Sequence, residues 1–124
     1  MFSSIIVTYN PDFDHVYDMC LELILAGVSV VVVDNTPCAP TKEFFMKKLE
    51  GVVGLDYHSM GKNVGLAKAF NYGINTLRGL AVEGVLFFDQ DSSINSKLVS
   101  ELISEYNYLN IFPRLKYKIL IQKR

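Results

Sequence analysis

Short runs of apolar, mostly β-branched or aromatic residues alternate along the chain with longer segments whose apolar residues recur at helical spacing. Gly27, Pro37 and Pro40 fall between such segments, where helices and strands are expected to break. The pattern predicts strands at residues 2–9, 28–33, 53–58 and 85–88, and helices at residues 11–26, 41–50, 65–78 and 95–108. This alternation predicts an α/β fold, a mostly parallel sheet flanked by helices on both faces.

The second expected strand is almost purely valine, which is typical of a parallel strand that is covered on both faces. A last apolar segment, residues 118–122, is expected to begin a fifth strand shortly before the chain ends at Arg124. A domain that stops as a strand begins is expected to be incomplete. We therefore expect one domain over residues 2–110, followed by a basic tail or incomplete strand over residues 111–124.

Composition limits the classes of protein that fit. The chain has 124 residues, enough for one domain, and its 50% hydrophobic and 20% charged content predicts a packed core rather than disorder. No apolar run reaches the roughly 18–20 residues that cross a bilayer, and the first residues lack the basic region of a signal peptide. The five basic residues from Arg114 onward leave the rest of the chain acidic, which argues against a nucleic-acid-binding body.

Residues that often serve as metal ligands are few. Cys20 and Cys38 have no metal-ligand spacing, and without a secretory signal they indicate a reducing, cytoplasmic environment. His15 and His58 show no evident partner, so structural roles are expected for both. The basic tail, with its apolar residues 119–121, suggests peripheral contact with the inner face of a membrane, although a solvated or unfinished strand is the simpler interpretation.

Polar residues gather where three of the expected strands end. These are Thr8–Asn10 after the first strand, Asp34–Thr36 after the second, and Asp89–Ser92 after the fourth. In an open parallel sheet, ligands bind beyond the carboxyl ends of the strands. The sequence therefore predicts that these three segments, far apart in the chain, share one edge of the sheet and one ligand site.

The carboxylates of Asp89 and Asp91 are the sharpest chemical feature. Residues i and i+2 of a strand point to the same face, so at a strand end both can flank one cation. Mg²⁺ takes one or two carboxylates and leaves its other positions to water and substrate phosphates. The simpler interpretation is a turn that leads into the next helix, with Asn95 or Ser96 as the cap. The position directly after a buried apolar strand favours a site for Mg²⁺ or Mn²⁺ that holds a diphosphate.

Asp34 ends the valine strand, where its carboxylate can accept hydrogen bonds from the base or ribose of a nucleotide. The alternative is turn chemistry, since Asp, Asn, Thr and Pro follow one another here. Thr8 and Asn10 pose the same choice, because Asn10 and Pro11 also form a good turn and helix start. Their functional interpretation is a pocket for a base, lined by the backbone.

The segment over residues 61–73 is rich in small residues at the start of an expected helix. Gly65 and Ala67 keep this start slim and permit close approach of a ligand to the backbone, and Asn71 lies on roughly the same side. The alternative is close packing of a helix on the sheet. The glycines form neither a phosphate-binding loop nor a dinucleotide fingerprint, and Lys62 is expected to be a solvated loop residue.

Taken together, these segments resemble family 2 glycosyltransferases of the GT-A fold, and in particular their rhamnosyltransferase-like branch. The matching motifs, in the order of the family and covering residues 2 to about 108, are Val7–Pro11, Val32–Asn35, Asn63–Ala67 with Asn71 and Gly73, and Asp89–Ser92. Each motif is weak alone, and the set is specific. Thr36 departs from the Gly-Ser that often follows the second motif.

The resemblance implies a role for each matched residue. A nucleotide base would lie against Thr8, Tyr9 and Asn10 and bind Asp34. The donor pocket would be shaped by residues that follow the third strand, which are Asn63, Gly65, Ala67 and Asn71. Asp89 would bind the ribose side, and Asp89 and Asp91 would hold a Mg²⁺ or Mn²⁺ ion on the diphosphate.

The resemblance also implies the reaction: a single displacement at the anomeric carbon, with inversion, that moves a sugar from a dTDP- or UDP-sugar to a saccharide or lipid-linked acceptor. In the resemblance, Asp-Gln-Asp-Ser at residues 89–92 in place of the commoner acidic triplet, together with Asn10-Pro11 after the first strand, points to a deoxysugar donor such as dTDP-L-rhamnose. The family's catalytic base lies in a later, acceptor-binding half, so no catalytic residue is assigned here.

Two other interpretations stay open at this point. The first is a non-catalytic, nucleotide-binding remnant that lacks the acceptor half and the base. The second is a phosphoryl-transfer domain that uses Asp89 as a nucleophile or metal ligand. Such folds usually place the key carboxylate after the first strand, where this chain has Thr8–Asn10 and no acidic residue before Asp12.

Overall fold

The computed structural model describes residues 1–37, 40–109 and 120–122. All of the expected helices and strands are present, and most of their ends lie within two residues of the prediction. In chain order they are β1 (Phe2–Thr8), α1 (Phe13–Leu25), β2 (Ser29–Asp34), α2 (Pro40–Leu49), β3 (Leu55–Ser59), α3 (Leu66–Thr76), β4 (Gly84–Asp89), α4 (Ser96–Leu109) and β5 (Leu120–Gln122).

The strands form one sheet in the order β3-β2-β1-β4-β5, and every pairing between neighbours is parallel. The expected fifth strand is confirmed at Leu120–Gln122, which pairs with β4, while residues 118 and 119 lie outside the described part of the chain. The predicted α/β fold with a parallel sheet is therefore confirmed.

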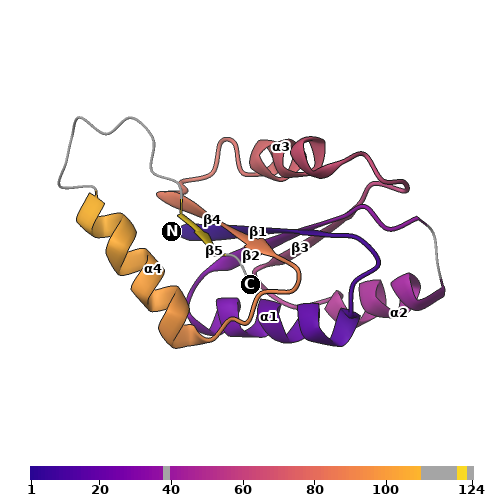
Figure 1. Cartoon of the computed structure of the whole chain (residues 1–124), viewed down its shortest axis with the longest axis horizontal. Helices are drawn as coiled ribbons and strands as arrows, with labels where there is room; N and C mark the ends of the chain where they lie inside the picture. The colour runs from indigo at the N-terminus through magenta and orange to yellow at the C-terminus, as the bar shows by residue number, and fades with distance from the viewer. Residues whose placement is uncertain (38–39, 110–119, 123–124) are drawn as a thin grey trace.

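Helices cover both faces of this sheet, as Figure 1 shows: α3 lies on one side, and α1, α2 and α4 lie on the other. Alternation along β1 separates the two cores. Ile6 packs with α1, α2 and α4 in the larger core, whereas Ile5 and Val7 pack with α3 in the smaller one. The valine strand β2 is buried on both faces, as its continuous apolarity predicts.

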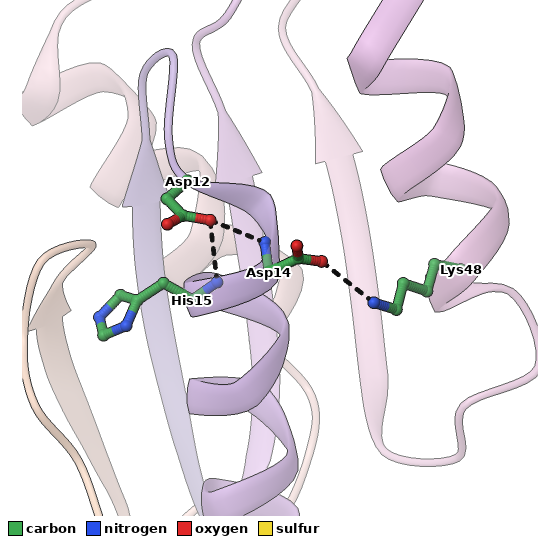
Figure 2. A network of polar contacts seen from close by, with 4 residues as sticks. All are labelled: Asp12, Asp14, His15 and Lys48. Carbon is green, nitrogen blue, oxygen red and sulfur yellow. Dashed lines mark hydrogen bonds and ion pairs between the residues drawn. The ribbon is translucent and has the colours of Figure 1, made fainter.

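Local signals in the sequence explain where α1 begins and ends. The carboxylate of Asp12 accepts hydrogen bonds from the backbone N–H groups of Asp14 and His15, which would otherwise lack partners (Figure 2). At the other end Gly27 adopts a φ of +82°, a left-handed conformation that glycine reaches without steric cost. An exposed ion pair of 3.2 Å between Asp14 and Lys48 joins α1 to α2 (Figure 2).

The start of α4 uses a cap from its own segment and a second one from α1. The side chain of Asn95 accepts a hydrogen bond of 2.8 Å from the N–H of Leu98. Of the two residues expected to cap this helix, Asn95 is therefore the one that does so. The carboxylate of Glu22 accepts the N–H of Ser96 at 3.1 Å. Because Glu22 belongs to α1, this bond fixes the two helices against each other on the larger core.

The order of the strands indicates where a sheet of this type binds ligands. From β1 the chain adds β2 and then β3 on one side, and it returns to the other side of β1 for β4. Ligands in open α/β sheets bind outside the carboxyl ends of the strands at such a reversal. The reversal here lies between β1 and β4, so the loops that follow Thr8 and Asp89 flank it.

Within the part of the chain that the structure describes, no helix is long and apolar enough to span a membrane. Cys20 is a buried free thiol, and burial raises its pKa to about 12. Cys38 and most of the basic tail lie outside the described residues, so the expectations on them stay predictions.

Candidate functional site

Asp89 and Asp91 lie in a tight turn at the end of β4, and both are exposed. The N–H of Asp91 donates to the carboxylate of Asp89 at 3.2 Å, and the N–H of Ser92 donates to the carbonyl of Asp89 at 3.0 Å. Asp89 is paired in register with Val7, the residue before the end of β1. The turn that the simpler interpretation expected is therefore present, and it presents both carboxylates to solvent beside the reversal in strand order.

Gln90, between the two carboxylates, turns its carboxamide to the loop after β1. Its Oε1 accepts the N–H of Tyr9 at 2.7 Å, and its Nε2 donates to the carbonyl of Tyr9 at 3.1 Å. Tyr9 itself is 47% exposed. The two loops that flank the reversal are thus joined directly, a contact that sequence reasoning did not assign to Gln90.

Asp34 is fully buried, and its carboxylate joins three strands. One oxygen accepts the hydroxyl of Thr8 on β1 at 2.9 Å and the N–H of Thr36 at 2.9 Å, and the other accepts the hydroxyl of Tyr57 on β3. Burial and this contact with Asp34 raise the pKa of the Tyr57 hydroxyl well above its ordinary value. The sequence predicted a carboxylate available to a nucleotide base, whereas the structure shows Asp34 engaged within the protein.

Alternation along the strands places Asp34 and Asp89 toward different faces of the sheet. Asp34 lies two positions after Val32, which packs in the larger core, and Asp89 lies two positions after Phe87, which packs in the smaller core beside α3. The shared edge that the sequence predicted is present, because Thr8 pairs in register with Asp34 and Val7 pairs with Asp89. The two carboxylates therefore flank the end of β1 from opposite sides.

Loop residues near the end of β2 connect these segments. The N–H of Asn10, a residue with a φ of +44°, donates to the hydroxyl of Thr36 at 2.8 Å. The carboxamide of Asn35 donates to the carbonyl of Gly65 at 3.2 Å and accepts the N–H of Val64 at 3.4 Å. Neither contact was predicted, because side chains of Asn and Thr in turns usually bond to their own backbone.

The start of α3 carries the remaining predicted residues. The side chain of Asn63 accepts the N–H of Gly65 at 2.9 Å. Gly65 has a φ of +88° with open space around it, so glycine is needed here for the backbone conformation. Ala67 and Asn71 are exposed on α3. Through the hydrogen bonds of Asn35 to Val64 and Gly65, the end of β2 thus fixes the start of α3 at the carboxyl edge of the sheet.

Both histidines contact other parts of the protein, as the structural roles expected for them imply. Nε2 of His15 donates to the carbonyl of Ser92 at 2.9 Å, so the first turn of α1 holds the turn that carries Asp91. The Tyr72 hydroxyl lies 3.3 Å from Nδ1 of His58, and the two rings pack edge to face. Sequence spacing gave no signal for these contacts, which join residues 77 and 14 positions apart.

The described residues line two hollows on the surface. A hollow of about 580 Å³ lies between α2 and β3, and a smaller one of about 420 Å³ lies between α1 and the loop before α4. Neither is lined by Asp34, Asp89 or Asp91. The candidate site is formed by the exposed loops at the carboxyl edge of the sheet.

Comparison with known proteins shows which family the chain resembles. No family model matches the chain. Over 99 residues, 80% of its length, the chain is 35% identical to the dTDP-rhamnosyl transferase RfbF of Shigella flexneri, of which it covers 32%. The crystal structure of S. aureus TarS, residues 1–349, matches 86% of the chain with a TM-score of 0.52 and 26% identity, and 33% of the TarS chain is covered.

The chain resembles the N-terminal portion of a rhamnosyltransferase-like family 2 glycosyltransferase. The family resemblance and the GT-A fold predicted from the sequence are thus confirmed. The chain spans about a third of the length of each of these two proteins.

A divalent ion, which GT-A enzymes of this family generally use, fits the residues of this glycosyltransferase-like edge. The part of the chain that the structure describes contains no group of three or more His, Cys, Asp or Glu side chains that could form a complete metal site. Asp89 and Asp91 offer two exposed carboxylates instead. Mg²⁺ is commonly bound by one or two carboxylates and completes its shell with substrate phosphates and water.

Proposed function

We propose that this chain is the donor-binding portion of an inverting, metal-dependent glycosyltransferase. The proposed donor is a nucleotide sugar, with dTDP-L-rhamnose as the first candidate. The proposed acceptor is a polysaccharide or a lipid-linked saccharide. The observation that carries the proposal is the exposed pair Asp89 and Asp91 at the reversal of strand order. The 35% identity with a dTDP-rhamnosyl transferase supports the choice of donor.

Asp89 and Asp91 are the residues that would hold Mg²⁺ or Mn²⁺ together with the diphosphate of the donor. The bound ion supplies positive charge that stabilises the negative charge developing on the departing diphosphate. Without it, the two exposed carboxylates would repel the diphosphate. Asp89, at the end of β4, would also face the ribose.

The base would lie over the ends of β1 and β2. Tyr9 and Asn10 are exposed there, and Thr8 is buried beneath them. Asp34 is fully buried, so it would not contact the base directly. It would support the base-binding loops instead, by holding Thr8 and Thr36 in place through hydrogen bonds. The donor pocket would continue along the start of α3, where Asn63, Gly65, Ala67 and Asn71 are all exposed.

The domain that performs this binding would span residues 2–110. No described residue is proposed as the base that deprotonates the acceptor. If the acceptor is lipid-linked, the chain would work in the cytoplasm at the inner face of a membrane. Flotation with vesicles that contain anionic lipid tests this peripheral contact, and binding that does not depend on residues 111–124 would exclude a role for the tail.

Calorimetric titration of the chain with dTDP, with and without Mn²⁺, tests the proposed function. We expect binding that needs Mn²⁺, and about tenfold or greater loss of affinity for Asp91→Asn, because a ligand charge on the ion is removed. The matched control is Asp56→Asn, an exposed carboxylate on β3 that should leave binding unchanged. A folded chain that binds neither dTDP nor UDP in the presence of Mn²⁺ contradicts the proposal.

A further inference from the structure

Gln90 separates the two carboxylates and pairs with both backbone groups of a single residue, Tyr9. Its Oε1 accepts at 2.7 Å and its Nε2 donates at 3.1 Å. A flipped carboxamide would set Nε2 against an N–H and Oε1 against a carbonyl, so the paired bonds determine the orientation of the amide. The amide of Asn or Gln carries a donor and an acceptor side by side on one planar group, and Asn is one methylene shorter.

This pairing continues the ladder between β1 and β4 beyond the end of both strands. Alternate residues of a strand direct their backbone N–H and C=O to opposite sides. After Val7, the next residue in this alternation that faces β4 is therefore Tyr9, which directly follows β1. The register between the strands ends at the pair Val7 and Asp89. The carboxamide of Gln90 therefore takes the place that a peptide group of β4 would hold if the strand continued.

Because the Gln90 side chain bonds the backbone of Tyr9, the chain can leave the sheet after Asp89 while the loop after β1 still has a hydrogen-bonding partner. The adjoining loops are linked in a similar manner: Thr36 accepts the N–H of Asn10, and Asn35 pairs with the backbone of residues 64–65. Among these side chains, Gln90 is the one that belongs to the turn carrying Asp89 and Asp91. Its bonds set how far that turn lies from the loop proposed to hold the base.

We propose that Gln90 is a positioning residue for a nucleoside diphosphate: its pairing with Tyr9 fixes the turn that carries Asp89 and Asp91 relative to the loop after β1. This inference rests on the proposed function. The diphosphate and the base of one ligand must contact two different loops. If the spacing between these loops is already fixed, binding has a smaller entropic cost, because the loops need not be ordered when the ligand arrives.

Amide hydrogen exchange measures the pairing without any ligand. In the wild-type chain the N–H of Tyr9 donates to Oε1 of Gln90, and we expect this bond to slow its exchange. Gln90→Met has a side chain of similar length without a hydrogen-bonding amide, and we expect it to accelerate exchange at Tyr9 about fivefold or more. Equal exchange at Tyr9 in wild type and Gln90→Met would overturn the inference.

Titration with dTDP and Mn²⁺ then measures the positioning role. We expect Gln90→Met to weaken binding about fivefold, while the midpoint of thermal unfolding changes little because Gln90 lies on the surface loops. The matched control is Asn107→Met, which removes an exposed carboxamide from α4 and should leave affinity unchanged. Wild-type binding that Gln90→Met leaves intact contradicts only the role of Gln90, whereas a wild-type chain that binds no dTDP contradicts the proposed function itself.

Discussion

At the scale of single residues, Asp34 shows how one side chain can serve the site from the interior. Its carboxylate accepts three hydrogen bonds, from Thr8, Thr36 and Tyr57, and so links the ends of β1 and β2 to the middle of β3. A buried carboxylate is stable only with such partners, since desolvation of a charge is costly. The geometry of the loops above it therefore depends on this residue.

Asp34→Asn tests that dependence. The amide keeps the shape of the side chain but has one acceptor oxygen, so it cannot accept from Thr8 and Tyr57 as the carboxylate does. We expect a loss of about 2 kcal/mol in the free energy of unfolding, measured by urea denaturation. Asp56→Asn, at an exposed position of β3, should change stability by less than about 0.5 kcal/mol. Equal stability of Asp34→Asn and wild type would show that the buried contacts contribute nothing.

Tyr57 gives a pH dependence with a defined sign. Its pKa in the folded chain is raised by burial and by the Asp34 carboxylate, so the folded state keeps the proton at pH values where the unfolded state loses it. The stabilisation is complete below the ordinary tyrosine pKa of about 10 and is lost as the pH rises above it. We expect the free energy of unfolding to fall between about pH 9 and pH 11.

Tyr57→Phe should remove part of this decline, because the variant has no proton to retain. Urea denaturation at a series of pH values measures the slope, and Tyr72→Phe, an exposed tyrosine on α3, serves as the matched control. A slope in Tyr57→Phe as steep as in wild type and in the control would mean that Tyr57 does not titrate differently in the folded and unfolded chain.

Which residues belong to the edge was predictable from the sequence, and what their side chains touch was not. The positions of Asp89 and Asp91 follow from a strand pattern that ends in polar residues, so their exposure at the sheet edge could be expected. The pairing of Gln90 with Tyr9 joins residues 81 positions apart, and the burial of Asp34 depends on Tyr57 of another strand. The sequence pattern around each residue cannot predict such contacts, because they join residues far apart in the chain.

At the scale of elements, the approach of α3 to the sheet is set by one glycine. Gly73 is buried, and a Cβ at this position would lie 2.9 Å from Cγ2 of Ile5 on β1. The sequence allowed two interpretations for the small residues of this segment, packing on the sheet or approach of a ligand. The structure assigns packing to Gly73, and it assigns a left-handed turn in open space to Gly65.

Gly73→Ala is expected to destabilise the chain, because the added methyl group must displace Ile5 or lift α3 from β1. The cost of overpacking, about 1–3 kcal/mol, exceeds the gain in helix propensity of about 1 kcal/mol. We expect a net loss of about 1 kcal/mol or more in the free energy of unfolding. Lys68→Ala, at an exposed position of the same helix, is the control and should be neutral. A Gly73→Ala chain as stable as wild type would contradict the close approach.

At the scale of the whole molecule, the reversal of strand order turns separate motifs into one edge. The sequence predicted the strands and their polar ends, because a buried parallel strand has a continuous apolar signal. It did not give the order β3-β2-β1-β4-β5, since that order is decided by which side of β1 each later strand joins. Once β1 lies between β2 and β4, Asp34 and Asp89 flank its end.

The central claim is that this edge binds the diphosphate of a nucleotide sugar through a divalent ion held by Asp89 and Asp91. Crystals of the chain grown with dTDP and Mn²⁺ test it most directly through the anomalous scattering of manganese. We predict one peak in contact with a carboxylate of Asp89 or Asp91 and with the dTDP phosphates, with the base beside Tyr9 and Asn10. A nucleotide bound elsewhere, or a manganese peak remote from both carboxylates, would contradict the account.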